Sequence, residues 1–222
     1  MILYDISMTI SPDITVYKNR VEKKPVFKET RNFLNNSVYE TRIDMDLHTG
    51  THIDMPLHLY PDGDASDKWN INQFLTNCLV LDFTVEKGVP LTDQHLEKKL
   101  HDFKTSNQLE LNEKSILLKT NNSIQEKFDF NFTYLDQSGA AFLAEKSISG
   151  VGIDTLGIER NQPCHETHKL LLKTGIWIIE GLRLHEVPQG EYILVILPLK
   201  LQGVEAMPAR AVILTPGSIC LS

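Results

Sequence analysis

Residues 48–58 read His48-Thr49-Gly50-Thr51-His52-Ile53-Asp54-Met55-Pro56-Leu57-His58, with three histidines and one carboxylate among eleven residues. Imidazole and carboxylate side chains bind divalent metals and transfer protons beside them. All four stand at even positions, so an extended chain would place them on one face. An unbroken strand would still spread them over roughly 30 Å, too far for a shared metal. Because Gly50 permits unusual backbone angles and Pro56 cannot continue a central strand, we predict a bent strand and loop that gathers these groups.

A polar surface loop is the alternative interpretation of this segment. Single histidines are common in proteins, and one of them alone would indicate little. Four ligand-type side chains of one parity, interrupted by a glycine and a proline, instead favour a metal site.

The composition is typical of a globular enzyme or binding protein. The chain has 222 residues, 41% of them hydrophobic and 23% charged, which fits one domain spanning residues 1–222, or at most two small domains. The formal net charge is −7 and no basic patch occurs, so we expect no nucleic-acid partner. A small molecule is the expected binding partner.

The sequence also bears on the cellular compartment. No stretch approaches the roughly 18 apolar residues of a membrane span, and residues 1–7 lack the pattern of a secretion signal. The cysteines Cys78, Cys164 and Cys220 are widely spaced and odd in number, so no disulfide framework is expected. We therefore expect a cytoplasmic protein without a membrane partner, with Cys78 in the core because it lies in an apolar run.

Short β-type runs dominate the chain and helical patterns are fewer. Strands are predicted at 2–10, 37–47, 78–84, 115–120, 151–154, 176–180, 192–199 and 211–214, and helices at 92–101, 138–146 and 165–173. The alternation over 39–47 predicts a half-buried strand. Residues 104–132 are polar around their one strand and are expected at the surface. The predicted fold is a single α/β domain, with a mixed or antiparallel sheet and flanking helices.

Two residues of the second half are candidates to complete the site. Glu180 ends a run that reads as a buried strand, where a carboxylate is costly unless it is paired or binds a metal. His168 lies in the predicted helix just before that strand, and an antiparallel helix–strand unit would bring the two together. Each has an alternative: Glu180 paired with Arg183 or Lys173, and His168 exposed, with His165 or Cys164 in its place. His165 and His168 are three residues apart, so the zinc-protease motif, which requires a spacing of four, is rejected. For Asp154 a structural role is favoured over one in orienting a ligand.

The segment 48–58 resembles the signature of the cyclase-like metal-dependent hydrolase family, which includes bacterial kynurenine formamidase and isatin hydrolase. The resemblance extends over most of the chain. It includes Asp5-Ile6-Ser7 with Ser11-Pro12, Gly150-Val151-Gly152-Ile153-Asp154-Thr155, His168-Lys169-Leu170-Leu171, Gly175-Ile176-Trp177-Ile178-Ile179-Glu180 and Pro208-Ala209-Arg210-Ala211-Val212. It implies a swivelling β/β/α fold, and a homodimer or homotetramer.

The resemblance also implies roles for individual residues. His48, His52 and Asp54 match the ligands of one metal. Asp54, His168 and Glu180 match those of a second, with Asp54 and Glu180 contacting both. His58 matches the catalytic acid/base. The implied cofactor is one or two divalent ions, with zinc expected first and manganese as the alternative.

The substrate-recognition residues depart from the family pattern. Tyr17 stands where kynurenine formamidase has a Trp that lines the substrate pocket, and Lys18-Asn19 replaces the usual Pro-Gly. Gly181 replaces an Asn that often follows the ligand Glu. Tyr17 is thus the predicted substrate-binding residue, with Trp69 and Phe74 as other candidate aromatic walls.

The predicted activity is hydrolysis of an amide or formamide C–N bond in a small aromatic substrate, as by an arylformamidase. The first alternative is a lactam or lactone hydrolase similar to isatin hydrolase, and a ring-forming or dehydrating enzyme is another. The remaining alternative is a non-catalytic protein that binds a metal or a small molecule. Structural zinc sites use four protein ligands and usually cysteines, whereas no cysteine is well placed here, which favours catalysis.

Overall fold

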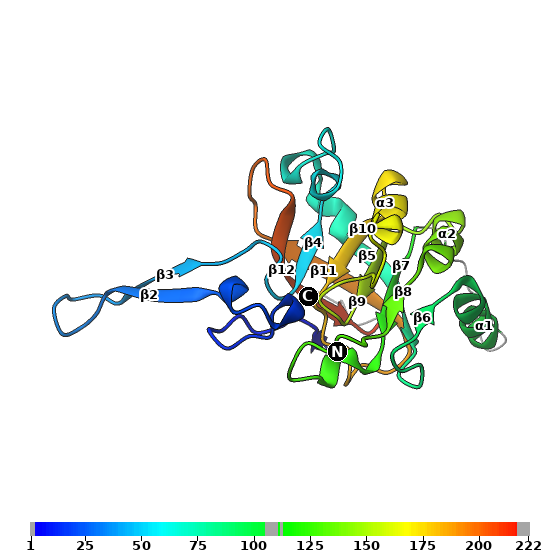
Figure 1. The fold of residues 1–222 in the computed structure, drawn as a ribbon, viewed down its shortest axis with the longest axis horizontal. Coiled ribbons are helices and arrows are strands. Elements are labelled where there is room, and N and C mark those ends of the chain that lie inside the picture. Colours follow the sequence, from blue (N-terminus) through cyan, green and yellow to red (C-terminus); the bar gives the residue numbers. More distant parts are fainter. Residues whose placement is uncertain (1–2, 105–110, 112, 217–222) are drawn as a thin grey trace.

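A closed mixed β-sheet forms the centre of the computed structural model, which describes residues 3–104, 111 and 113–216 (Figure 1). The strand order is β1-β12-β11-β5-β7-β9-β10-β4, and β4 also pairs with β12, which closes the sheet into a barrel. The strands are β1 (Leu3–Asp5), β4 (His52–Asp54), β5 (Leu75–Asp82), β7 (Ser115–Lys119), β9 (Gly150–Ile153), β10 (Trp177–Glu180), β11 (Gly190–Pro198) and β12 (Ala206–Leu214).

One half of the barrel is parallel and carries the helices. β5, β7, β9 and β10 are parallel neighbours, whereas the pairings that involve β1, β4, β11 and β12 are antiparallel. The connections between the parallel strands contain α1 (Asp93–Lys104), α2 (Gln137–Glu145) and α3 (Glu166–Lys173). These helices lie together on one side of the sheet in Figure 1. The predicted α/β fold with a mixed sheet and flanking helices is confirmed.

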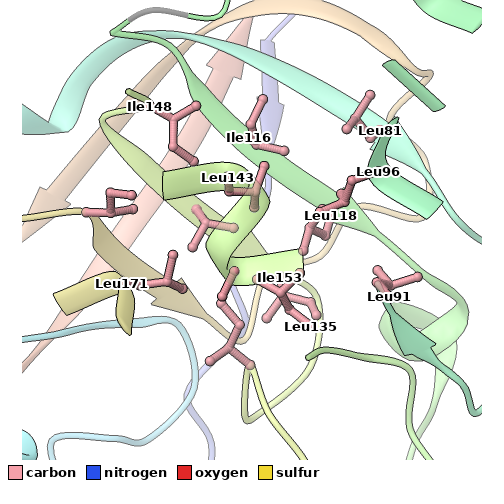
Figure 2. Packing of buried hydrophobic residues seen from close by; sticks show 14 of the residues in the cluster. Leu81, Leu91, Leu96, Ile116, Leu118, Leu135, Leu143, Ile148, Ile153 and Leu171 are labelled. Atoms are coloured by element: carbon pink, nitrogen blue, oxygen red, sulfur yellow. The ribbon is translucent and has the colours of Figure 1, made fainter. Parts of the chain in front are cut away.

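The parallel strands are buried on both faces, so successive residues enter two different cores. Leu79 and Leu81 of β5 pack under the helices, while Cys78 and Val80 of the same strand point into the barrel. The helix-side core takes Leu143 from α2 together with residues of the other two helices (Figure 2). Cys78 is fully buried, as predicted.

A two-stranded arm projects away from this body. Within the described ranges, β2 (Val26–Arg31) and β3 (Glu40–Asp44) pair only with each other, and every residue of both strands is exposed. Figure 1 shows this hairpin extending beyond the barrel and its helices. β3 confirms a strand within 37–47, but the half-buried character predicted from the alternation over 39–47 is wrong, because no other element in the described part of the chain covers either face.

Shorter elements fill the connections. β6 (Pro90–Leu91) and β8 (Tyr134–Leu135) form a small parallel pair beside the helices. The 3-10 helices are η1 (Tyr17–Asn19), η2 (Val21–Lys23), η3 (Pro56–His58), η4 (Ser66–Lys68), η5 (Ile71–Phe74) and η6 (Asn121–Ile124). Among the described residues, no helix combines the length and the apolar character needed to cross a bilayer.

Two further predictions need correction. The strand predicted over 2–10 is only β1, after which Ser7 makes an isolated bridge to Leu182. Residues 104–132 were expected at the surface, but all of β7 is buried and so are Asn122 and Ser123. Polar groups there are buried because they bond within the fold; for example, the Ser123 hydroxyl donates to Asp154. Residues 105–110 and 112 lie outside the described part of the chain.

Candidate metal centre

The segment 48–58 folds back on itself as predicted. Gly50 has φ +68°, a left-handed conformation that glycine adopts without a steric penalty. The extended part is only β4, three residues long, and Pro56 then begins the 3-10 helix η3. His48 therefore precedes the strand, His52 and Asp54 lie on it, and His58 follows in η3.

The register of two strands brings the second carboxylate to this segment. β4 and β10 are antiparallel, and Glu180 stands directly opposite His52. α3 precedes β10 and places His168 near its own N-terminus, at the same end as Glu180. The predicted meeting of His168 and Glu180 is confirmed, since the imidazole Nε2 lies 3.2 Å from Glu180 Oε1.

Asp54 lies at the centre of the cluster. Its Oδ1 is 3.0 Å from His48 Nδ1 and 3.4 Å from His52 Nε2, and its Oδ2 is 3.5 Å from His168 Nε2. Glu180 Oε2 lies 3.6 Å from His52 Nε2, so this carboxylate also faces histidines of both groups. The five predicted ligands thus converge from β4, β10, α3 and the loop before β4, which carries His48.

Two carboxylates are buried at the site, and their negative charge is costly unless positive charge lies nearby. Asp54 and Glu180 are 1% and 4% exposed. Burial alone would lower the pKa of His52, but contacts with Asp54 and Glu180 outweigh it and raise that pKa to about 9. The pKa of His168 is likewise held well above its ordinary value, against the effect of burial, by Asp54, Glu159 and Glu180. Burial would raise the pKa of Asp54, but hydrogen bonds with the histidines hold it well below the usual range.

Unsatisfied buried atoms support a metal at this position. His48 Nε2, His52 Nε2 and both carboxylate oxygens of Asp54 are buried without a hydrogen-bond partner. Buried polar atoms are normally paired, and each exception calls for an explanation. His48, His52 and Asp54 offer one compact set of ligand atoms, and Asp54, His168 and Glu180 offer a second. Nitrogen and carboxylate ligands in such sets fit zinc or manganese.

His58 and Tyr17 line the cavity above the cluster. The centroid of the His58 ring is 4.3 Å from that of His48 and 6.1 Å from that of His168. Burial lowers the pKa of His58 despite the nearby Asp54. The ring of Tyr17 packs edge-on against Phe128 at 4.9 Å, and burial together with the charge of Glu180 raises its pKa. The roles of these residues in catalysis and binding remain predictions.

The alternatives weighed for these residues have clear outcomes. Glu180 is paired with histidines, and no ion pair joins it to Arg183 or Lys173 within the described ranges. His168 is only 7% exposed, so it is not a surface residue. Trp69 and Phe74 stack on each other beside the barrel core and do not line the cavity.

Asp154 stands apart from the cluster. Its carboxylate accepts hydrogen bonds from the Thr120 backbone N–H at 3.0 Å and from the Thr120 hydroxyl at 2.6 Å. These contacts fit the structural role favoured for this residue.

Two residues that bear on the site were not singled out from the sequence. Glu159 is buried beside His168, and Thr51 bridges two segments by donating to Gly181 O at 2.6 Å and accepting from Met8 N at 2.8 Å. Glu159 lies in an irregular loop with no periodic pattern around it. Thr51 stands at an odd position, whereas the predicted ligands of the same segment stand at even positions. Neither residue could therefore be identified as part of the site from the sequence alone.

Residues 4–160 of the chain match the family described as putative cyclase. This chain belongs to the cyclase family. Kynurenine formamidase from Salinibacter ruber, a relative, is 31% identical over 221 residues, covering 96% of this chain and 97% of that protein. Kynurenine formamidase from Bacillus cereus is 30% identical over 80% of each chain.

Solved structures agree with this membership in the cyclase family. A predicted metal-dependent hydrolase from Bacillus stearothermophilus is 40% identical, with a TM-score of 0.80 over 95% of this chain and 97% of that one. Isatin hydrolase A from Labrenzia aggregata has a TM-score of 0.80 at 21% identity, over 96% of this chain and 93% of that one, and so supports the fold alone. The cyclase-like fold expected from the resemblance is confirmed.

Proposed function

We propose that this protein is a metal-dependent hydrolase that cleaves the C–N bond of a small aromatic amide or formamide. The observation that carries the proposal is the convergence of His48, His52, Asp54, His168 and Glu180 at the floor of a cavity, with buried ligand atoms that lack hydrogen-bond partners. The names of the related proteins, kynurenine formamidase and metal-dependent hydrolase, support the same reaction class.

The proposed cofactor is one or two divalent ions, held by the two sets of ligands that share Asp54. Zinc is proposed first, because imidazole and carboxylate ligands suit it, and manganese is the alternative. A metal bound there would supply Lewis acidity, lowering the pKa of a water molecule and polarising the substrate carbonyl. Asp54 and Glu180 would balance the charge of the cation within the buried floor.

His58 is the proposed proton carrier. Burial lowers its pKa, so the ring is neutral near pH 7 and has a nitrogen lone pair ready to accept a proton. In hydrolysis, the oxygen of water bonds to the carbonyl carbon and the C–N bond breaks. The His58 nitrogen would take the proton that water loses and give it to the leaving nitrogen.

Tyr17 is the proposed contact for an aromatic ring of the substrate. Its ring lines the cavity, and at Gly157 a Cβ would come within 3.2 Å of Tyr17 Cε2, so the glycine leaves room for the ring. An aryl formamide such as N-formylkynurenine is therefore the first substrate to test. The cytoplasm is the proposed compartment, supported by the free and exposed thiol of Cys164.

The test is hydrolysis of N-formylkynurenine by chelator-stripped protein to which zinc or manganese is added back in turn. We expect activity to return with one of the two metals. His58→Ala should then lower turnover by about 10²–10⁴-fold, which is typical of losing a general acid/base, while metal content by elemental analysis is unchanged.

Other outcomes separate the alternatives. Metal binding without hydrolysis of N-formylkynurenine would exclude that substrate, and cyclic amides, including isatin, and lactones would be assayed next. Metal binding without turnover of any acyl compound would favour a non-catalytic binding protein. Loss of metal from the His58→Ala protein would contradict the role given to His58 and make it a ligand.

A further inference from the structure

Glu159 is a buried carboxylate that contacts the site without belonging to either set of predicted ligands. It lies in the loop between β9 and α3 and is 6% exposed. Its Oε1 is 2.9 Å from His168 Nδ1 and 2.6 Å from His165 Nδ1. Its Oε2 accepts from the backbone N–H groups of Thr167 at 3.0 Å and His168 at 3.3 Å.

We propose that Glu159 is a positioning residue that fixes both the ring orientation and the tautomer of His168, so that His168 Nε2 is the nitrogen offered to the metal. This inference rests on the metal centre proposed above and goes beyond it by assigning a role to a residue outside the ligand sets. His165 is the second partner that holds the carboxylate in place.

The first argument concerns the tautomer. His168 Nδ1 lies 2.9 Å from Glu159 Oε1 but off the direction of a hydrogen bond. Because a carboxylate has no proton to give, this close contact is favourable with the proton on Nδ1. A neutral imidazole has one N–H, which leaves the lone pair on Nε2. That nitrogen lies 3.5 Å from Asp54 Oδ2 and 3.2 Å from Glu180 Oε1, within the cluster. Metal-binding histidines generally need such a partner on the other ring nitrogen.

The second argument concerns rigidity. The same carboxylate holds the His168 ring through Oε1 and the His168 backbone through Oε2, so the side chain and the first turn of α3 are fixed together. A negative charge at this end of the helix is also favoured by the helix dipole.

The third argument concerns His165, which is the left-handed N-cap of α3 at φ 55°. Its side chain is 53% exposed and lines the same cavity as His58, yet its Nδ1 shares Glu159 Oε1 with His168. Glu159 therefore contacts both His165, which lines the cavity, and His168, which belongs to the second set of predicted ligands. These two partners fix the position of its carboxylate.

The rival interpretation is that Glu159, His165 and His168 bind a metal of their own. His168 would then have to offer Nδ1 to one ion and Nε2 to another, which requires the loss of both ring protons. Glu159 Oε2 is in addition already occupied by two backbone N–H groups. The hydrogen bonds that Glu159 accepts from Thr167 N, His168 N and His165 Nδ1 favour a positioning carboxylate over a metal ligand.

The experiment compares zinc affinity, by competition with a chromophoric chelator, in wild-type protein and in Glu159→Gln. The amide NH₂ of glutamine cannot accept a hydrogen bond, so either the histidine rings or the backbone N–H groups lose their acceptor. We expect zinc affinity to fall about 10–100-fold, the usual effect of removing such a partner. Asp136→Asn is the matched control, because Asp136 also accepts from a helix N-terminus, at Gly139 N, but lies outside the cavity. Its zinc affinity should equal that of the wild type.

A second measurement uses the wild-type protein and does not depend on the variant folding. Nitrogen-15 NMR of the histidine rings in zinc-loaded protein should show His168 with its proton on Nδ1. A proton on Nε2, or a folded Glu159→Gln protein with unchanged zinc affinity, would overturn the inference while leaving the proposed function intact. Binding of a third zinc ion by the wild-type protein, lost in Glu159→Gln while the affinities for the other two are unaltered, would also overturn it, in favour of the rival site. Wild-type protein that binds no metal would overturn the proposed function as well.

Discussion

Gly181 follows Glu180 directly and controls how closely two chain segments approach at the site. Its φ of +69° is left-handed, and a Cβ at this position would lie 2.3 Å from the carbonyl oxygen of Gly50. Asn, which often stands here in the family, tolerates the same backbone angle. In this chain, however, the Gly50 peptide occupies the space that a side chain would need. Glycine in place of asparagine at position 181 therefore allows the loop that carries His48 to pack closely against this segment.

We expect Gly181→Ala to destabilise the protein and to weaken metal binding. The left-handed conformation costs a non-glycine residue about 1–2 kcal/mol, and the contact with Gly50 adds to this by pushing the His48 loop outward. Gly203→Ala is the matched control, since Gly203 has φ +71° but a Cβ there would meet no atom within 4 Å. Urea unfolding and zinc titration of both variants provide the measurement. Equal losses of stability, with equal zinc affinity, would show that the contact with Gly50 is unimportant.

At the scale of elements, Asp154 ties the end of β9 to the segment after β7. Its carboxylate accepts from Thr120 and Ser123 and is fully buried. Burial raises its pKa to about 6, although the hydrogen bonds to the ionised form oppose that shift. The unfolded chain has the ordinary value of 3.8. The folded protein therefore keeps this proton at pH values where the unfolded chain has lost it.

The pH dependence follows from that difference. Below about pH 4 both states are protonated, and between pH 4 and pH 6 only the folded state is, so the free energy of unfolding falls as pH rises through this range. The two-unit shift corresponds to about 3 kcal/mol, with no further change from this group above pH 6. Asp154→Asn cannot ionise and should lack this contribution. Urea midpoints of both proteins from pH 4 to pH 7 test it, because other titrating groups are common to the two. Parallel curves would contradict the prediction.

The elements also show what the sequence could and could not predict. The three helices were placed to within a few residues, because periodic apolar positions and Gly175 mark α3 and similar signals mark the others. The bent strand predicted within 48–58 contains β4, but its place in the sheet is not predictable from the sequence. It has only three residues, and its pairing with both β10 and β12 depends on closure of the barrel. The convergence of the five predicted ligands could be anticipated because they follow the chain order of a recognised pattern. Glu159 was not, because its partners meet it only in the folded chain.

At the scale of the whole molecule, the arm formed by β2 and β3 has no element of the described chain packed against it. An isolated two-stranded hairpin is at best marginally stable in water, and this one exposes a series of apolar side chains. They are Val26, Phe27, Phe33, Leu34, Val38, Tyr39 and Ile43. The base of the arm reaches the cavity, where Lys23 and Asp46 form an ion pair at 3.0 Å and both line the rim. A partner that covered the arm would therefore border the cavity.

Charge favours a second copy of this chain as that partner. The arm itself, residues 26–44, has three Lys and Arg and three Asp and Glu and is neutral, whereas residues 18–25 at its base have four Lys and Arg and one Glu, a net charge of +3. The remainder of a chain of net charge −7 therefore carries −10. The basic segment 18–25 and the apolar arm beside it are together complementary to an acidic body of the same kind of molecule. We propose on this basis that the chain forms a homodimer through the arm, and that a homotetramer would be a pair of such dimers.

We expect Ile43→Glu to convert the oligomer into monomers. Ile43 is 49% exposed and pairs with Phe27 across the hairpin, so a charge there costs the isolated chain little but places an unpaired carboxylate in the interface. Val85→Glu is the matched control, because Val85 is 78% exposed on a turn distant in sequence from the arm. Light scattering during size-exclusion chromatography should give a multiple of 25.2 kDa for the wild type and the control, and one chain mass for Ile43→Glu. A wild-type protein of one chain mass would contradict self-association, and an oligomer that persists in Ile43→Glu would place the interface elsewhere.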